Sequence, residues 1–195
     1  DVEQNTKLAK QSGGRGQFGD VTLRIEPLES GSGLIFESEI TGATLPTEYY
    51  GPVEQGFKEA AQSGVVAGHP VVDIKAILID GSHHEVDSSE VAFKIASSMA
   101  FKEACQKASP FILEPVMLME VVTPEEFLGD VLGDLQSRRA QVQSMEPQAG
   151  LQIVKAHVPL AETFQYATIL RSNTTGRASF TQELDHYAPA PMKDK

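Results

Sequence analysis

The chain has 195 residues and a formal net charge of −11, and 41% of its residues are hydrophobic. This composition is ordinary for a soluble protein of one large or two small domains, and no apolar run approaches the roughly 20 residues that span a membrane. The acidic balance excludes unspecific nucleic-acid binding through a broad basic surface, so any RNA contact has to be focal. The single cysteine, Cys105, excludes an internal disulfide, and we expect a buried thiol and a cytoplasmic protein without a secretory signal.

The first twelve residues are polar, and we expect them to begin irregularly. A loop with four glycines, one arginine and one glutamine follows them: Gly13-Gly14-Arg15-Gly16-Gln17-Phe18-Gly19. Glycine-rich backbone can enter φ > 0 conformations and can approach a ligand closely. From Phe18 to Leu28 apolar and polar residues alternate, which predicts a half-buried strand that supports the loop.

The loop also matches the pattern G-x-G-x-x-G, which is weak evidence when it stands alone. A dinucleotide site needs a strand before this pattern and a helix after it, whereas here a strand follows. A kinase-type loop needs H-R-D and D-F-G segments, and the sequence has neither. A nucleotide cradle is therefore disfavoured, and a structural turn and a loop that contacts a polymer remain as alternatives.

Three elements are predicted between the two loops of interest. A turn at residues 29–33 separates the first strand from a second one at residues 36–40. A helix is predicted from Pro52 to Gly64, because proline suits a first helical turn and glycine suits the position after the last. Its apolar face has four members: Val53, Phe57, Ala60 and Ala61. A strand after Pro70 is predicted to place four residues on one face: Val72, Ile74, Ala76 and Leu78.

A second loop, residues 80–87, has two histidines and leads into the strongest helical pattern, residues 88–107. Asp87 is predicted to cap this helix, with Glu90 completing a capping box. The helix is predicted to bury a stripe of four apolar residues: Ala92, Ile95, Ala96 and Met99. Ser109-Pro110 is expected to stop it.

The histidine loop allows three interpretations. His83, His84, Glu85 and Asp87 have metal-ligating groups, although adjacent histidines point apart on regular backbone. The histidines could instead be solvated, with Asp87 serving only as a helix cap. The third interpretation is a contact site at the loop tip.

Catalysis finds little support in this sequence. A Ser-His-Asp arrangement of Ser88, His84 and Asp87 is disfavoured because these residues are too close along the chain and no G-x-S-x-G segment exists. His69 and His157 are expected to be structural.

The pattern changes beyond Glu114-Pro115, and we expect two domains, residues 1–112 and 113–195. The second domain is predicted to have the order β-α-β-β-α-β, which is that of the ferredoxin-like fold. Its first helix is predicted to begin with Thr123 as cap and Pro124 at the first position. Its second helix is predicted over residues 160–170.

Four arginines in the second domain have side chains that could make specific contacts. Arg138 and Arg139 are expected to interact with the C-terminal carbonyls of their own helix. Arg171 and Arg177 flank a Ser-Asn-Thr-Thr-Gly turn, where they could contact phosphate.

Three segments together resemble translational elongation factor G, in the order found in that family. The segments are Gln11-Ser12-Gly13-Gly14-Arg15-Gly16-Gln17-Phe18-Gly19, Gly81-Ser82-His83-His84-Glu85-Val86-Asp87-Ser88-Ser89-Glu90 and Tyr166-Ala167-Thr168-Ile169-Leu170-Arg171-Ser172. The resemblance covers nearly the whole chain and corresponds to the family's fourth and fifth domains. It implies an α+β protein in which a ribosomal-protein-like arm with a left-handed βαβ crossover precedes the ferredoxin-like domain.

The resemblance implies a mechanical role in GTP-driven translocation on the ribosome. The family's fourth domain enters the decoding region, where its tip meets the duplex of transfer RNA and messenger RNA. The two tip loops match residues 13–19 and 82–88, and His84 takes the position of the family's tip histidine. The implied RNA-contacting residues are Gly13, Gly14, Arg15, Gly16, Gln17, His83, His84, Glu85, Val86 and Asp87. The fifth domain lies on large-subunit RNA, for which Arg171 and Arg177 are the candidates.

The family's GTPase domain has no counterpart here, because the sequence contains no G-x-x-x-x-G-K-[ST] segment. We therefore expect no enzymatic activity and no cofactor in this chain, with GTP and magnesium bound elsewhere in a full-length factor. The expected partners are ribosomal RNA, transfer RNA and messenger RNA, without a membrane, for a monomeric protein.

A few positions depart from the family's pattern. His83 stands where tyrosine is frequent and Glu85 where aspartate is frequent, while Ala140 and Gln165 replace common glycines. The tip changes leave a ribosome-recycling or tetracycline-protection relative as an alternative. A free-standing RNA-binding protein is the other alternative.

Overall fold

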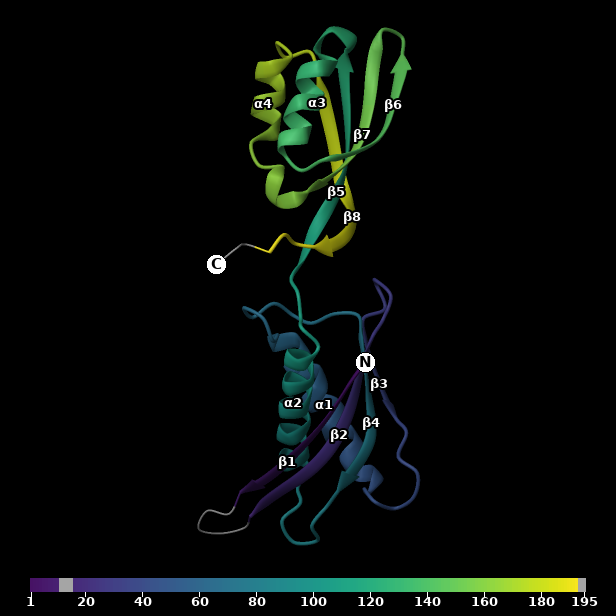
Figure 1. The fold of residues 1–195 in the computed structure, drawn as a ribbon, viewed down its shortest axis with the longest axis vertical. Helices are drawn as coiled ribbons and strands as arrows, with labels where there is room; N and C mark the ends of the chain where they lie inside the picture. The colour runs from purple at the N-terminus through teal and green to yellow at the C-terminus, as the bar shows by residue number, and fades with distance from the viewer. Residues whose placement is uncertain (11–15, 193–195) are drawn as a thin grey trace. The chain divides into compact units, whose positions relative to one another are not determined.

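The computed structural model describes residues 1–10 and 16–192 (Figure 1). The chain divides into two compact units, Asp1–Phe111 and Ile112–Lys195. Each unit has one four-stranded sheet and two α-helices in its described part, so the mixed, two-domain architecture is confirmed. None of the helices in the described ranges is long and apolar enough to cross a membrane.

The sheet of the first unit has the order β1-β2-β4-β3. Its strands are β1 (Val2–Lys10), β2 (Gln17–Pro27), β3 (Leu34–Ser38) and β4 (Ile74–Ser82). Of these described strands, β3 and β4 pair in parallel while the other neighbours are antiparallel, and α1 (Tyr50–Ser63) connects β3 to β4 as a βαβ unit. The left-handed sense expected for this crossover stays a prediction. A second helix, α2 (Glu90–Lys107), packs with α1 on one face of the sheet (Figure 1).

The expectation of an irregular start was wrong, because Val2–Lys10 forms an edge strand. Thr6 and Leu8 are buried while their neighbours are exposed, which is the alternation of a strand with one wet face. Two inward-facing residues of this strand, Gln4 and Thr6, are polar. They donate hydrogen bonds of 2.7 and 3.0 Å, respectively, to the carboxylate of Glu103 on α2. Polar side chains at inward positions concealed the period-two pattern in the sequence.

Helix α1 follows the predicted pattern, with Val53, Phe57, Ala60 and Ala61 all buried. It begins two residues before Pro52, after a 3-10 turn at Thr47–Tyr49. It ends where predicted, because the residue after the last turn, Gly64, has a φ of 81°.

The predicted cap of α2 was wrong. Ser89 caps the helix by accepting a 3.1 Å hydrogen bond from the Ala92 N–H, and Asp87 lies outside it. The predicted stripe was half wrong, since Ile95 and Met99 are 38% and 39% exposed. The helix packs on both α1 and the sheet, so its buried face is a wider band of small and aromatic residues: Ala92, Phe93, Ala96, Ser97, Ala100, Phe101, Ala104 and Cys105.

The buried thiol of Cys105 leads to a pH prediction. Burial raises its pKa to about 11, against about 8.5 for a free cysteine. Because the folded pKa lies above the unfolded one, the associated stability is complete below about pH 8.5 and is lost between there and pH 11. We expect negligible thiol modification by Ellman's reagent at pH 8 in the folded chain and full modification in urea. Rapid labelling of the folded chain at pH 8 would contradict this burial.

The second unit has the order β6-β7-β5-β8, with every neighbouring pair antiparallel, and this confirms the ferredoxin-like prediction. Its elements are β5 (Leu113–Pro124), α3 (Leu128–Ser137), β6 (Gln141–Gln148), β7 (Leu151–Pro159), α4 (Tyr166–Asn173) and β8 (Ser179–Pro189). Both helices cover one face of the sheet (Figure 1), where Val131, Leu135, Tyr166 and Leu170 join its core.

Both helix starts predicted in the second unit need correction. Thr123 and Pro124 belong to β5, and a 3-10 turn at Glu125–Phe127 precedes α3. Residues 160–162 form another 3-10 turn, and α4 begins only at Tyr166. Gln165, which has a left-handed φ of 61°, separates that turn from the helix.

The predicted interaction of Arg138 and Arg139 with their own helix end was also wrong. Arg138 donates to the carboxylate of Asp134 and to the Glu162 carbonyl, and its guanidinium lies 5.0 Å from the centre of the Tyr166 ring. Arg139 bonds both carboxylate oxygens of Glu114. The two arginines therefore connect separate segments of the unit.

Candidate functional site

The start of β2 and the loop after β4 lie at the same end of the first unit. The two strands are antiparallel, with Asp20 opposite Ser82, so β2 begins where β4 ends (Figure 1). Residues 83–88 then turn back along β2, because the Phe18 N–H donates a 3.0 Å hydrogen bond to the Asp87 carbonyl. The Ser88 hydroxyl donates to the Phe18 carbonyl at 3.2 Å, and the backbones of Phe18 and Ser88 form a parallel bridge. The described part of the glycine loop, from Gly16, thus lies beside the histidine loop.

Gly13, Gly14 and Arg15 lie outside the described residues, so their predicted role as part of the tip stays a prediction. Gly16 and Gly19 are described, and neither has a positive φ. Gly19 is needed because it packs closely against backbone, whereas Gly16 faces only the Asp87 side chain, which can move. A Cβ on Gly16 would lie 3.0 Å from the Asp87 carboxyl carbon, and one on Gly19 would lie 2.8 Å from the Ala92 carbonyl oxygen.

The histidine loop is closed by its own hydrogen bonds. The Ser88 N–H donates to the His84 carbonyl at 3.0 Å, and the His84 N–H donates to the Ser88 hydroxyl oxygen at 2.7 Å. These bonds hold the backbone and leave the imidazole of His84 57% exposed, with its Nδ1 atom 3.7 Å from an Asp87 carboxylate oxygen. Neighbouring side chains are exposed too, including Glu85 and Val86. The loop is an ordered platform for exposed side chains.

Two further side chains lie at this end that the sequence interpretation missed. The Lys7 ammonium lies 5.1 Å from the centre of the Phe18 ring, and the ring of Tyr49 lies 6.5 Å from that of His83. Tyr49 is itself fixed by stacking on Phe93 at 4.3 Å. No sequence pattern could have placed Lys7 here, because the polar inward residues of β1 hide its strand character.

Asp20, an acidic residue near the start of β2, has hydrogen-bond partners of its own. The carboxylate of Asp20 accepts hydrogen bonds from the Asn5 amide at 2.9 Å and from the Ser82 hydroxyl at 2.7 Å. We name the site formed by Lys7, Gly16, Gln17 and residues 83–88 the tip. Its exposed side chains include the donors Lys7, Gln17, His83 and His84, although the molecule as a whole is acidic.

The geometry does not support the other chemistries considered for the histidine loop. The Ser88 hydroxyl is engaged with Phe18 and with the His84 backbone, so it has no base arrangement of the serine-hydrolase type. Within residues 1–10 and 16–192, this loop does not bring three metal-ligating groups together.

Arg171 and Arg177, the predicted RNA contacts of the second unit, are both exposed. The guanidinium of Arg177 forms an ion pair with Glu126 and lies 5.6 Å from the centre of the Phe127 ring. Arg171 is on the last turn of α4. A contact of either residue with RNA stays a prediction.

Comparison with known proteins gives a match for each unit. Residues 1–109 match the family model described as "Elongation factor G, domain IV", and residues 111–195 match "Elongation factor G C-terminus". A crystal structure of a protein from Thermus thermophilus is 48% identical to this chain, with a TM-score of 0.84. The similarity covers 97% of this chain and 28% of that one, so the chain spans only about that fraction of its structural relative.

Proposed function

Because the chain belongs to the elongation factor G family, we propose that its tip contacts the duplex of transfer RNA and messenger RNA in the decoding region during translocation. The two matched domains make the chain the C-terminal portion of a translocase. The observation that supports a contact role is the tip itself, where two loops distant in sequence are joined by the hydrogen bonds between Phe18, Asp87 and Ser88.

The chemistry of the tip suits RNA. Ammonium, amide and imidazole groups donate hydrogen bonds to phosphates, riboses and base edges, and the imidazole can also stack on a base. The tip gathers four exposed donors, Lys7, Gln17, His83 and His84, although Glu85 and Asp87 also belong to it.

The remaining parts of the proposal concern the whole factor. We propose that the second unit lies on large-subunit ribosomal RNA through Arg171 and Arg177, and that the factor acts as a cytoplasmic monomer. Since neither matched domain has a phosphate-binding loop, GTP and magnesium would bind elsewhere in the full-length protein.

Photocrosslinking tests this contact. A benzoylphenylalanine in place of Val86, which is 64% exposed on the histidine loop, should crosslink the full-length factor to transfer RNA or messenger RNA in stalled translocation complexes. Val72 is the matched control, because it is also exposed, at 48%. It lies just before the first residue of β4, whereas Val86 follows the last one, so the length of the strand separates the two positions by roughly 25 Å or more. Equal RNA crosslinking from both positions, or none from Val86, would reject the proposed placement.

A further inference from the structure

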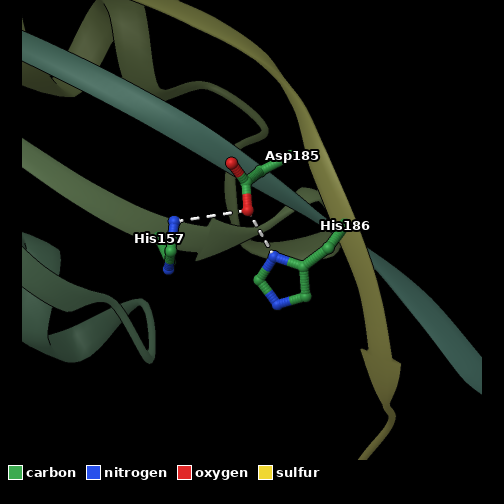
Figure 2. A group of neighbouring side chains, drawn as sticks. All are labelled: His157, Asp185 and His186. Carbon is green, nitrogen blue, oxygen red and sulfur yellow. Dashed lines mark hydrogen bonds and ion pairs between the residues drawn. The ribbon is translucent and has the colours of Figure 1, made fainter. Parts of the chain in front are cut away.

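Two histidines and an aspartate meet on the sheet of the second unit (Figure 2). Asp185 lies between them, with its Oδ2 atom 3.4 Å from His157 Nε2 and 2.6 Å from His186 Nδ1. One ligand atom from each residue lies within 4.8 Å of both others. His157 comes from β7 and the other two from β8, with β5 between these strands. The group therefore joins two strands that are not hydrogen-bonded to each other.

A β-bulge explains how adjacent residues serve one site. Along the β5–β8 ladder, Val116 pairs with His186 and Met117 pairs with Leu184, so Asp185 is an extra residue on β8. Adjacent residues of a regular strand point to opposite faces, whereas an inserted residue lets two successive side chains share a face. His157 is on the same face, because its neighbours Ala156 and Val158 are buried in the core beneath the helices.

We propose that His157, Asp185 and His186 bind a divalent transition-metal ion of the zinc type. Two imidazole nitrogens and one carboxylate oxygen are ligands that suit zinc and related first-row ions, and they are a poor set for magnesium or calcium. Ligand atoms around a tetrahedral zinc are roughly 3.3–3.5 Å apart, given bonds of about 2.0–2.2 Å. Small side-chain rotations bring atoms that already lie within 4.8 Å to those separations.

The surroundings leave the site accessible. His157 and His186 line an open cleft of about 260 Å³, which has room for water to complete the coordination. The side chains of His157, Asp185 and His186 are 25%, 35% and 42% exposed. In the described chain, the ion pairs of Asp185 are with these two imidazoles and not with a lysine or arginine. The nearby Arg139 is paired with Glu114 and Glu162, so its charge is offset.

The alternative is a purely structural group, in which the two imidazoles contact only the Asp185 carboxylate. That alternative predicts no binding of metal at neutral pH. A bound metal would instead connect β7 to β8 across β5 and would raise the melting temperature of the chain.

Calorimetric titration of the tag-free, chelator-treated 195-residue chain with zinc tests the proposal. We expect one zinc per chain, a rise in melting temperature with zinc concentration, and visible absorption bands when cobalt is used instead. Replacing His157 or His186 with alanine, or Asp185 with alanine, should each weaken zinc binding at least about tenfold. Circular dichroism without metal would verify that each variant is folded.

The double variant His83→Ala/His84→Ala is the matched control, because it removes two exposed histidines from the tip and leaves this group intact. It should bind zinc like the parent chain. The proposal is overturned if the parent chain binds no zinc, if binding survives the His157 and His186 substitutions, or if the tip variant loses it.

Discussion

Replacing Gly56 with alanine is expected to destabilise the first unit by about 3 kcal/mol, the upper range for overpacking a core. Gly56 is buried on α1 where that helix crosses α2. A Cβ there would lie 2.2 Å from the Lys94 carbonyl oxygen, 3.0 Å from its carbonyl carbon and 3.1 Å from its Cα. All three atoms belong to helix backbone, so relief requires the two helices to separate and the packing of Phe57 and Ala60 to loosen.

Gly51→Ala is the matched control on the same helix. A Cβ at Gly51 meets no heavy atom within 4 Å apart from its chain neighbours, so the change should cost far less than at Gly56. It should be close to neutral, because the helix-propensity gain of roughly 0.5–1 kcal/mol is opposed by the steric restriction on a residue that precedes proline, here Pro52. Hydrogen exchange followed by mass spectrometry on peptides of α1 and α2 would report the first unit separately from the second. Equal protection of these peptides in the two variants would show that the helices do not meet as closely as described.

Strongly periodic segments of this protein could be predicted from the sequence. Helix α1 has an apolar face and a glycine stop, and both follow from local chemistry. The β-α-β-β-α-β order of the second unit could also be predicted, because its strands are rich in apolar residues and most of its turns contain proline or glycine. The position of the tip was predicted only from the resemblance to a family. Strand topology decides which loops lie at the same end of a sheet, and the sequence pattern alone does not give that topology.

Features that depend on tertiary contacts could not be predicted. Polar inward-facing side chains of β1 hydrogen-bond to Glu103 of α2, a tertiary contact that the sequence pattern of the strand does not reveal. Asp87 looks like a helix cap, but its carbonyl is used by Phe18 and Ser89 caps α2 instead. The group of His157, Asp185 and His186 depends on a single-residue bulge, which no sequence pattern reveals.

Replacing His84 with alanine in the full-length factor is expected to slow translocation about tenfold. Loss of one stacking or hydrogen-bonding contact with RNA costs about 1–3 kcal/mol, and about 1.4 kcal/mol corresponds to a factor of ten in rate. The substitution should leave the loop in place, because the bonds that close it involve the His84 backbone and Ser88. Within the described chain the exposed imidazole makes no hydrogen bond. Its Nδ1 atom lies 3.7 Å from an Asp87 carboxylate oxygen, and its ring centre lies 6.1 Å from that of Phe18.

His69→Ala is the matched control for this experiment. His69 is an exposed histidine of the same unit, between α1 and β4, at the end opposite the tip. Its substitution removes the same imidazole group without touching the proposed RNA contact, so translocation should proceed at the parent rate.

The deciding measurement is single-round translocation of the His84→Ala and His69→Ala factors, made beside their ribosome-stimulated GTP hydrolysis. We predict that the His84 variant translocates about tenfold more slowly while hydrolysing GTP at the parent rate, and that the His69 variant matches the parent in both. Parent-like translocation by the His84 variant, or a parallel fall in its GTP hydrolysis, would contradict the assignment of this loop as the part that contacts the moving RNA.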